Sequence, residues 1–375
     1  MKAEELYNII GSEFYTGVPD SQLKALCGFL MDKYGIDEKH HIIAANEGNS
    51  LALAAGYHLA TSKIPVVYMQ NSGEGNIINP LASLVNDKVY AIPVVFIIGW
   101  RGEPGIHDEP QHIYQGMVTE KLMNDMDVAT FVISKDTTYD EAKSAMDHFK
   151  EVLAAGKQVA FIIGKGALSF EGNVEYRNDN TLNREEVIGH ITAVSHDDPI
   201  VSTTGKISRE LFENRTNTGR PHGSDFLTVG SMGHCSSIAL AVAINRPEKR
   251  IWCIDGDGAV LMHMGSMPVI GSIAPKNLIH IVINNAAHET VGGMPTVAGS
   301  CDLVTIARSC GYKHAVSVNT LDDLDRELSA AAQRGALSFI EVKCSISSRS
   351  DLGRPTTTAL ENKEAFMEYI QHEES

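Results

Sequence analysis

Positive charge is scarce in this sequence of 375 residues: 31 lysines and arginines stand against 47 aspartates and glutamates, for a formal net charge of −16. Nucleic acids and anionic membrane surfaces attract proteins with a positive face. The charge balance therefore argues against either as the main partner. A small anionic ligand remains compatible with it, because backbone amides and a few cations can form a local positive pocket.

Cysteine motifs and long apolar runs are also missing. The six cysteines form no CxxC pair, and reduced thiols in the cytosol are the default for so few. The longest apolar run, Ile92 to Trp100, is too short to cross a bilayer, which takes about 20 residues. The first ten residues contain glutamates where a signal peptide would be apolar. We expect a soluble, cytoplasmic protein that binds neither nucleic acid nor membrane.

What the sequence does contain is a regular alternation of short apolar runs and longer stretches suited to helices. Continuous hydrophobicity predicts strands covered on both faces, and the intervening segments are long enough for crossover helices. The runs expected to form strands are His41–Ala45, Pro65–Met69, Pro93–Ile98, Ala129–Ser134, Val159–Gly164, Pro199–Thr203, Asp225–Val229, Arg250–Ile254, Leu278–Ile283, Ala315–Val318 and Ser338–Val342.

This pattern predicts an α/β protein with two doubly wound parallel-sheet domains of similar size, in keeping with a length that favours two or three domains. Residues 171–186 are polar, rich in asparagine and poor in apolar side chains, as interdomain linkers are. We therefore expect domains at residues 1–170 and 187–375.

Polar groups follow two of the expected strands in the second half. Asp255-Gly256-Asp257-Gly258 comes directly after one strand, and Asn284-Asn285 follows the next. An isolated Gly-Asp-Gly is more often a surface turn. Here, however, a carboxylate and an amide oxygen at neighbouring strand ends can converge on one Mg²⁺ ion, together with phosphate oxygens.

Gly-Asp-Gly followed after this interval by Asn-Asn resembles the thiamine diphosphate signature. The resemblance implies that Asp257, Asn285 and the main-chain carbonyl of Ala287 hold a magnesium ion on the cofactor's diphosphate. It also implies that Met232 lies beneath the bent cofactor, although this residue could be an ordinary core methionine. The cofactor-binding residues that it implies are Glu47, Thr204, Gly205, Gly230, Met232, Gly256, Asp257, Gly258, Ala259 and Asn285.

Glu47 begins a helix-like run of small residues in the first half. Taken alone, a glutamate in a first helical turn is usually a favourable partner of the helix dipole. The segment from Glu47 to Tyr57 matches the E-G-x-x-x-A-x-A-x-G-Y pattern of thiamine enzymes. The resemblance implies that Glu47 contacts the ring nitrogen of the cofactor's pyrimidine and so creates the base that removes the thiazolium proton.

Several expected strand-end loops narrow the resemblance to the thiamine diphosphate-dependent family of phosphonopyruvate and sulfopyruvate decarboxylases, over nearly the full chain. These loops are Thr16–Ser21, Asn71–Gly73, Gly99–Gly105, Asp108–His112, Thr290–Gly293 and Asp351–Thr356. The family implies a pyrimidine-binding domain at 1–170, a diphosphate-binding domain at 187–375 and no central third domain. It also implies a homo-oligomer, dimeric or larger, whose active sites are shared between subunits.

The implied reaction is decarboxylation of 3-phosphonopyruvate to 2-phosphonoacetaldehyde and CO2, a carboxy-lyase step of phosphonate biosynthesis. Sulfopyruvate or another short 2-oxo acid is the alternative. Sulfopyruvate enzymes are often split into two chains, so the single chain favours the phosphonate. By the same resemblance, Asp20 and His112 transfer protons at the reacting carbon. The residues that it suggests for substrate binding are Asp20, Ser21, Arg101, Gln111 and Arg354, each arginine of which could equally serve a loop or an interface.

Two residues depart from the family pattern. Glu74 follows Asn71-Ser72-Gly73 where an aliphatic residue is expected, and Met294 stands where a glutamine is more usual. A carboxylate facing the pocket would repel an anionic substrate, so we expect Glu74 to point to solvent or to a cation. A non-catalytic thiamine-fold protein would not need Glu47, Asp257 and Asn285 together. A Rossmann dehydrogenase would need a G-x-G-x-x-G turn that the first strand-end loop lacks.

Overall fold

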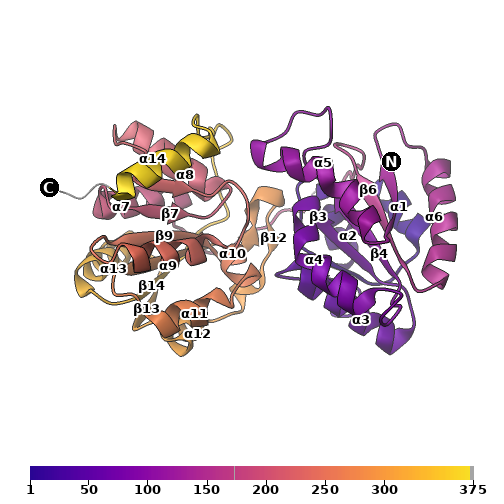
Figure 1. Ribbon diagram of the computed structural model, residues 1–375, viewed down its shortest axis with the longest axis horizontal. Coiled ribbons are helices and arrows are strands. Elements are labelled where there is room, and N and C mark those ends of the chain that lie inside the picture. Colours follow the sequence, from indigo (N-terminus) through magenta and orange to yellow (C-terminus); the bar gives the residue numbers. More distant parts are fainter. Residues whose placement is uncertain (173, 372–375) are drawn as a thin grey trace. The chain divides into compact units, whose positions relative to one another are not determined.

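The computed structural model describes residues 1–172 and 174–371. The chain forms two compact units, Met1–Glu175 and Tyr176–Ser375, shown in Figure 1. Residue 173 of the predicted linker and residues 372–375 of the predicted second domain lie outside the described residues. Within the described ranges, no helix combines the length and apolar character needed to cross a membrane.

The first unit is a six-stranded parallel sheet in the order β2-β1-β3-β4-β6-β5. Its strands are β1 Tyr15–Gly17, β2 His41–Ile43, β3 Val66–Gln70, β4 Val94–Gly99, β5 Ala129–Ile133 and β6 Gln158–Ile163. Its α-helices are α1 Ala3–Ile10, α2 Lys24–Tyr34, α3 Glu47–Thr61, α4 Glu74–Pro80, α5 Pro110–Asp125 and α6 Tyr139–Ala154. The short helical turns η1 Asn71–Gly73 and η2 Leu81–Val85 flank α4.

The second unit is another six-stranded parallel sheet, in the order β13-β14-β10-β9-β7-β8. Its strands are β7 Ile200–Ser202, β8 Asp225–Leu227, β9 Ile251–Gly256, β10 Leu278–Asn284, β13 His314–Val318 and β14 Ser338–Lys343. Its α-helices are α7 Arg184–Ser195, α8 Lys206–Asn217, α9 Cys235–Asn245, α10 Asp257–Met262, α11 Ser266–Ile273, α12 Leu303–Cys310, α13 Leu321–Arg334 and α14 Ala359–Gln371. A small hairpin joins β11 Ala287–His288 to β12 Met294–Pro295, with the turns η3 Glu289–Val291 and η4 Val297–Gly299 around it.

The two sheets share one topology. Numbered within its own unit, each sheet runs second, first, third, fourth, sixth, fifth. In both, the chain direction across the sheet reverses between the first and third strands, which is β1 and β3 in the first unit and β7 and β9 in the second. Ligands of open α/β sheets bind at the carboxyl ends of the strands beside such a reversal. Topology therefore marks one candidate edge in each unit.

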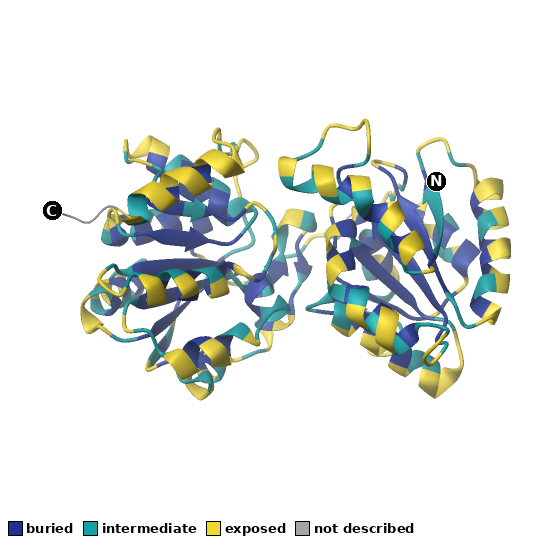
Figure 2. Cartoon of the chain, viewed as in Figure 1, coloured by how far each residue is buried: buried dark blue, intermediate teal, exposed yellow. Residues whose placement is uncertain are grey.

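Apolar side chains pack on both faces of each sheet. Along β9, Trp252 and Ile254 belong to the cluster under α7, α8 and α13, whereas Ile251 and Cys253 belong to the cluster under α9, α11 and α12. Figure 2 shows the buried strands as dark blue ribbons between helices with exposed outer faces. Burial on two faces explains why the sequences of the strands are continuous apolar runs.

The predicted two-sheet α/β architecture is confirmed, and each predicted strand run corresponds to a strand. The strand before the predicted Thr16–Ser21 loop was expected without bounds, and the structure gives it three residues, Tyr15–Gly17. The β11–β12 hairpin was not predicted. Within the predicted linker, Leu182 is buried in the core of the second unit and bridges to Cys344, and α7 begins at Arg184.

Candidate active site

Asp257 and Asn285 lie at the same edge of the second sheet. Strands β9 and β10 are parallel neighbours, with Gly256 opposite Ile283. Asp257 follows β9 directly as the first residue of α10, and Asn285 comes just after β10. Their side chains are 4% and 6% exposed. The edge is the one marked by the reversal between β7 and β9.

The contacts of these two side chains suit a magnesium site. Thr296 Oγ1 donates a hydrogen bond to Asp257 Oδ2 at 2.5 Å, and burial raises the pKa of Asp257 to about 6. Asn285 Oδ1 accepts from the amide of Ala287 at 3.1 Å. A buried carboxylate with little compensation is costly unless it meets a cation. Carboxylate, amide and main-chain carbonyl oxygens are the hard donors that Mg²⁺ takes alongside phosphate. The donor set at this edge therefore fits the predicted metal.

The loops after the neighbouring strands, next to the candidate magnesium site, contain glycines. Gly205, between β7 and α8, has φ +90°, a conformation open to glycine. Thr204 Oγ1 donates to the carbonyl of Val229 at 2.8 Å, which ties the loop after β7 to the loop after β8. Gly230 lies half-buried in that second loop, and Ala259 is buried in α10.

Met232 packs against Gly258. A Cβ placed on Gly258 would lie 3.2 Å from Met232 Cε and 3.6 Å from Cε1 of His288. The structure thus brings together Met232 and the Gly-Asp-Gly turn, as the sequence predicts, and adds His288. Burial lowers the pKa of His288 to about 4, so its imidazole is neutral at physiological pH.

Glu47 is the first residue of α3 and is 5% exposed. Asn46 caps this helix, since its side chain accepts from the amide of Gly48 at 2.8 Å. The Glu47 carboxylate accepts a hydrogen bond from Asn76 Nδ2 at 2.7 Å. Burial raises its pKa, against the opposing effect of that hydrogen bond. A carboxyl with a raised pKa can exchange a proton with a heterocyclic nitrogen more readily than an ordinary glutamate.

Asp20 is fully buried in the loop after β1. Its carboxylate accepts from Gln70 Nε2 at 2.5 Å and from the amide of Gln22 at 2.9 Å. Burial raises its pKa, and these two hydrogen bonds oppose the rise. Gly99, at the end of β4, leaves room for the group: a Cβ there would stand 2.2 Å from Asp20 Oδ2.

Arg101 links Asp20, Ser21 and His112 in one cluster of the first unit. Its guanidinium donates to Asp108 through Nε at 2.7 Å and through a second nitrogen at 2.5 Å, and to Ser21 Oγ at 3.2 Å. Burial and, to a smaller extent, the charge of Arg101 lower the pKa of His112 to about 4, while Asp108 opposes the shift. His112 is therefore uncharged at neutral pH.

The two other predicted substrate residues lie in α5 and in the segment before α14. Gln111 is half-buried in the first turn of α5, next to His112. Arg354 is exposed in the segment between β14 and α14 of the second unit. The neighbouring Leu352 and Gly353 are tied to α8, because Arg209 donates to both of their carbonyls.

The expectation for Glu74 is wrong. Its side chain points neither to solvent nor to a cation: it is fully buried at the start of α4. Its Oε2 accepts from Gln115 Nε2 at 3.2 Å, while its Oε1 has no hydrogen-bond partner among the described residues. Burial raises the pKa of Glu74 to about 9, so the carboxyl is protonated at neutral pH. The second departure, Met294, is buried in β12 opposite His288.

Several residues around the site were not predicted from the sequence. Gln70, Asn76, Gln115 and Thr296 hold predicted acids or their neighbours through hydrogen bonds. Gln70 ends β3 directly before the Asn71-Ser72-Gly73 motif, and Asn76 lies three residues after it in α4, so their proximity to the motif was a usable signal. Thr296 offered none, because it reaches Asp257 only through the β11–β12 hairpin.

Each of the two units matches a family of known proteins. A family described as "Thiamine pyrophosphate enzyme, N-terminal TPP binding domain" matches residues 5–126. Another, described as "Thiamine pyrophosphate enzyme, C-terminal TPP binding domain", matches residues 203–342. Together with the two sheets and their buried acids, these matches define a thiamine pyrophosphate enzyme.

Relatives of similar length narrow the class. The phosphonopyruvate decarboxylase of Streptomyces viridochromogenes is 31% identical over 96% of this chain and 92% of its own. That of Streptomyces hygroscopicus is 31% identical over 96% and 91%. The sulfopyruvate decarboxylase of Methanosarcina acetivorans is 26% identical over 91% and 90%. The chain therefore belongs to the phosphonopyruvate decarboxylase family of thiamine pyrophosphate enzymes. Several other sulfopyruvate decarboxylases match only as separate alpha or beta subunits, but the Methanosarcina protein matches over 90% of its length, so a single chain does not by itself decide between the two substrates.

Proposed function

We propose that the protein decarboxylates 3-phosphonopyruvate to 2-phosphonoacetaldehyde and CO2, with thiamine diphosphate and Mg²⁺. The observation that carries this proposal is the full-length similarity to two phosphonopyruvate decarboxylases, in a chain that keeps Glu47 and Asp257 buried at the sheet edges. A cytoplasmic location goes with it, in keeping with six free cysteines.

The cofactor would be held by residues of both units. Asp257, Asn285 and the carbonyl of Ala287 would bind the magnesium, and the loop at Thr204 would contact the diphosphate. Glu47 would exchange a proton with the pyrimidine nitrogen, which its raised pKa favours. When bound, thiamine diphosphate supplies the electron sink that decarboxylation of a 2-oxo acid requires.

The reaction breaks the bond between the carboxylate and the carbonyl carbon, and a proton takes the place of the departing CO2. We assign delivery of that proton to Asp20, because burial raises its pKa and favours the carboxylic acid form. His112 is neutral, so its role is to accept or relay a proton within the cluster rather than to carry a standing charge.

The acidic head group of the substrate would meet Arg101 and Ser21. Arg101 is fixed in place by two hydrogen bonds to Asp108 and one to Ser21, and a guanidinium is well shaped for a phosphonate or sulfonate. Gln111 is a polar neighbour. Arg354, on an exposed segment of the second unit, is a further candidate for binding the head group.

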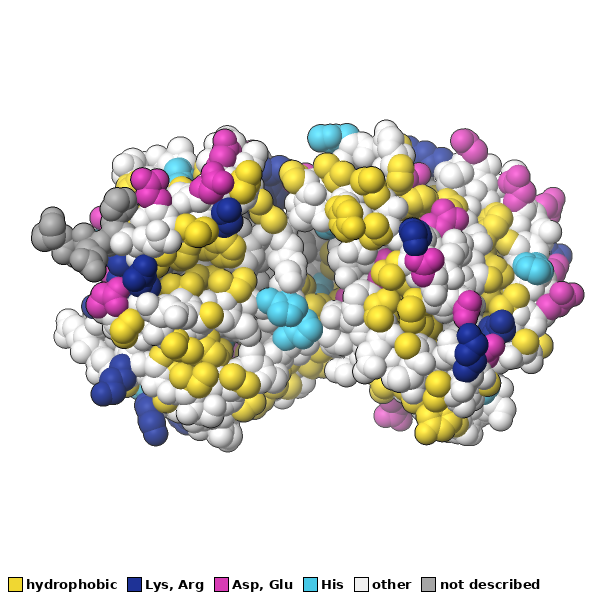
Figure 3. Space-filling model, in the orientation of Figure 1, with side chains coloured by type: hydrophobic (Ala, Val, Ile, Leu, Met, Phe, Trp, Pro, Cys, Tyr) yellow, Lys and Arg dark blue, Asp and Glu magenta, His cyan; other side chains and the backbone are white. Residues whose placement is uncertain are grey.

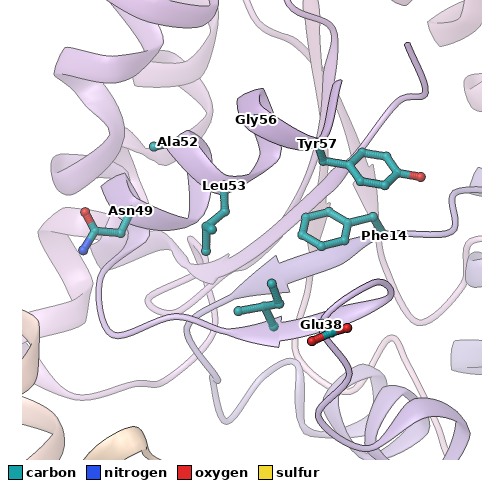
Figure 4. Close-up of a pocket in the computed structure, with 8 residues that line it drawn as sticks. Phe14, Glu38, Asn49, Ala52, Leu53, Gly56 and Tyr57 are labelled. Atoms are coloured by element: carbon teal, nitrogen blue, oxygen red, sulfur yellow. The ribbon is translucent and has the colours of Figure 1, made fainter. Parts of the chain in front are cut away.

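Self-association is part of the proposal. On the outer face of α3, Leu53 and Leu59 are 39% and 73% exposed. Ala52, Leu53, Gly56 and Tyr57 of that helix line a mainly apolar pocket, shown in Figure 4. Hydrophobic side chains also gather over α5 in Figure 3, where Tyr114 is 74% exposed. Exposed apolar surface is typical of interaction sites, and we propose a homo-oligomer with active sites shared between copies.

The substrate is tested by CO2 release from apo-protein. 3-Phosphonopyruvate, sulfopyruvate and pyruvate are each supplied with and without thiamine diphosphate and Mg²⁺. Release from 3-phosphonopyruvate that needs both cofactors is expected. Sulfopyruvate is the second candidate, because a full-length relative carries that name, and release from sulfopyruvate alone would replace the phosphonate with it. Release independent of cofactor would overturn the mechanism.

Shared sites are tested by mixing two inactive variants. Glu47→Gln disables the first unit and Asp257→Asn the second, so each homo-oligomer should be inactive. If one copy supplies each half of a site, refolding the two variants together should restore part of the activity. Mixtures that stay inactive, although both variants fold and exchange subunits, would contradict sharing.

A further inference from the structure

Asn285 lies against a compact ionic network in the second unit. Arg184 and Glu210 are 4% and 2% exposed, and Arg184 pairs with Glu210 through two hydrogen bonds of 2.6 Å. Arg184 also donates to Glu289, and Lys206 donates to Glu289 Oε1 at 2.9 Å. Two cations and two carboxylates balance, so the network carries no net charge towards its surroundings.

The network fixes the side-chain amide of Asn285. Glu289 Oε2 accepts a hydrogen bond from Asn285 Nδ2 at 2.8 Å. An ionised carboxylate can only accept, so the amide nitrogen must face Glu289 and the amide oxygen must face away from it. That oxygen accepts from the amide of Ala287 at 3.1 Å and keeps a second lone pair. The rotamer is therefore held at both ends.

The preceding asparagine is held in the same way by a different residue. Asn284 Nδ2 donates to Glu341 Oε1 at 2.7 Å, and Asn284 Oδ1 accepts from the amide of Ala286 at 2.9 Å. Each asparagine of the pair thus has its own glutamate. Glu341 holds Asn284, which pairs with β14, and Glu289 holds Asn285 at the candidate metal edge.

Both carboxylate oxygens of Glu289 accept hydrogen bonds. Its Oε2 is occupied by Asn285 and Arg184, and its Oε1 by Lys206. These contacts with Arg184 and Lys206 hold the carboxylate in place as an acceptor for Asn285.

We propose that Glu289 is a positioning residue for the magnesium site, which turns the amide oxygen of Asn285 towards the metal while Arg184 and Lys206 hold Glu289 in place. This inference rests on the proposed function, because it takes Asn285 as a magnesium ligand. It goes beyond that function by naming the residue that determines the ligand's orientation. Partners that orient metal ligands typically contribute about 10- to 100-fold to metal affinity.

The test compares Glu289→Leu, Glu289→Gln and the control Glu185→Leu. Glu185 is a partly exposed carboxylate of α7 that pairs with Arg349 and does not contact Asn285. Apo-protein freed of metal is saturated with thiamine diphosphate, and Mg²⁺ is titrated by calorimetry. We expect Glu289→Leu to weaken Mg²⁺ binding about 10- to 100-fold. Glu289→Gln, which keeps an acceptor for Asn285 but loses the charge, should fall between Glu289→Leu and wild type. Glu185→Leu should match wild type.

Folding and function are read out separately. Circular dichroism and urea unfolding of the apo-proteins show whether each variant folds. If Glu289→Leu does not fold, the isosteric Glu289→Gln decides the question alone. Wild-type Mg²⁺ affinity in folded Glu289 variants would overturn the positioning role and leave the proposed function intact. A wild-type protein that binds no Mg²⁺ with thiamine diphosphate would instead overturn the proposed function.

Discussion

Gly73 leaves its side-chain space to the carboxylate of Glu47. A Cβ on Gly73 would stand 2.5 Å from Glu47 Oε1, which is too close for any real contact. The backbone of Gly73 has φ −74°, a conformation that any residue can adopt. Glycine is therefore needed at position 73 because Glu47 occupies the space that a side chain would fill, and not because of the backbone conformation.

Gly73→Ala should consequently displace Glu47 and little else. We expect activity to fall by about 100-fold, because misplacing a catalytic group by roughly 1 Å has that effect. Gly75→Ala is the matched control, since a Cβ there meets nothing within 4 Å. Steady-state decarboxylation and thermal unfolding of both variants check the prediction. Equal activity in the two would contradict it.

Contacts of this kind cannot be predicted from the sequence. Asp257 and Asn285 could be predicted together, because both follow continuous apolar runs and parallel strands end at one edge. The contact of Gly73 with Glu47 depends on how η1 packs against α3, and no local pattern encodes it. The bounds of strand β1 could not be predicted for a related reason: three residues are too few to show a hydrophobic pattern.

The burial of Glu74 was unpredictable for a different reason. Charged residues are almost never fully buried without a partner, so a solvent-facing position was the sound expectation. The structure buries it against Gln115 in its neutral form. Likewise the common topology of the two sheets could not be read from the sequence, since no repeat accompanies it.

Glu74 should make the stability of the protein depend on pH. Its pKa is about 9 in the folded protein, against 4.5 for an ordinary glutamate. Below pH 4.5 Glu74 is protonated in both the folded and the unfolded state, and it does not change the free energy of unfolding. Between pH 4.5 and 9 the unfolded state ionises first, so stability is lost as pH rises. By pH 7 the loss is roughly 3 kcal/mol.

Glu74→Gln removes this dependence. We expect the variant to unfold at a higher temperature than wild type at pH 8, and at an equal or lower temperature at pH 4.5, where the buried amide has no advantage. Urea unfolding between pH 4.5 and 9 measures the crossover. Parallel curves for the two proteins would show that Glu74 is ionised in the folded state.

Arg101 should govern substrate affinity more than turnover. Its guanidinium is held by Asp108 and Ser21, and a lysine cannot reproduce that geometry. Hydrogen bonds to charged groups are worth about 1.5 to 3 kcal/mol, so Arg101→Lys should raise KM for 3-phosphonopyruvate about 10- to 100-fold. Ser21→Ala, which loses one contact, should have a smaller effect. A fall in kcat with unchanged KM would assign Arg101 to the chemical step instead.

His112 should be neutral over the whole working range of the enzyme. Burial first and then the positive charge of Arg101 lower its pKa to about 4, so protonation begins only below about pH 5. Titration of carbon-13-labelled histidine by NMR can follow the imidazole directly, with His112→Gln to assign its signal. Arg101→Met should move the titration to higher pH, because it removes the repelling charge and leaves Asp108. A midpoint near 6.5 in wild type would mean that the imidazole is solvated, and it would return the role of proton donor to His112.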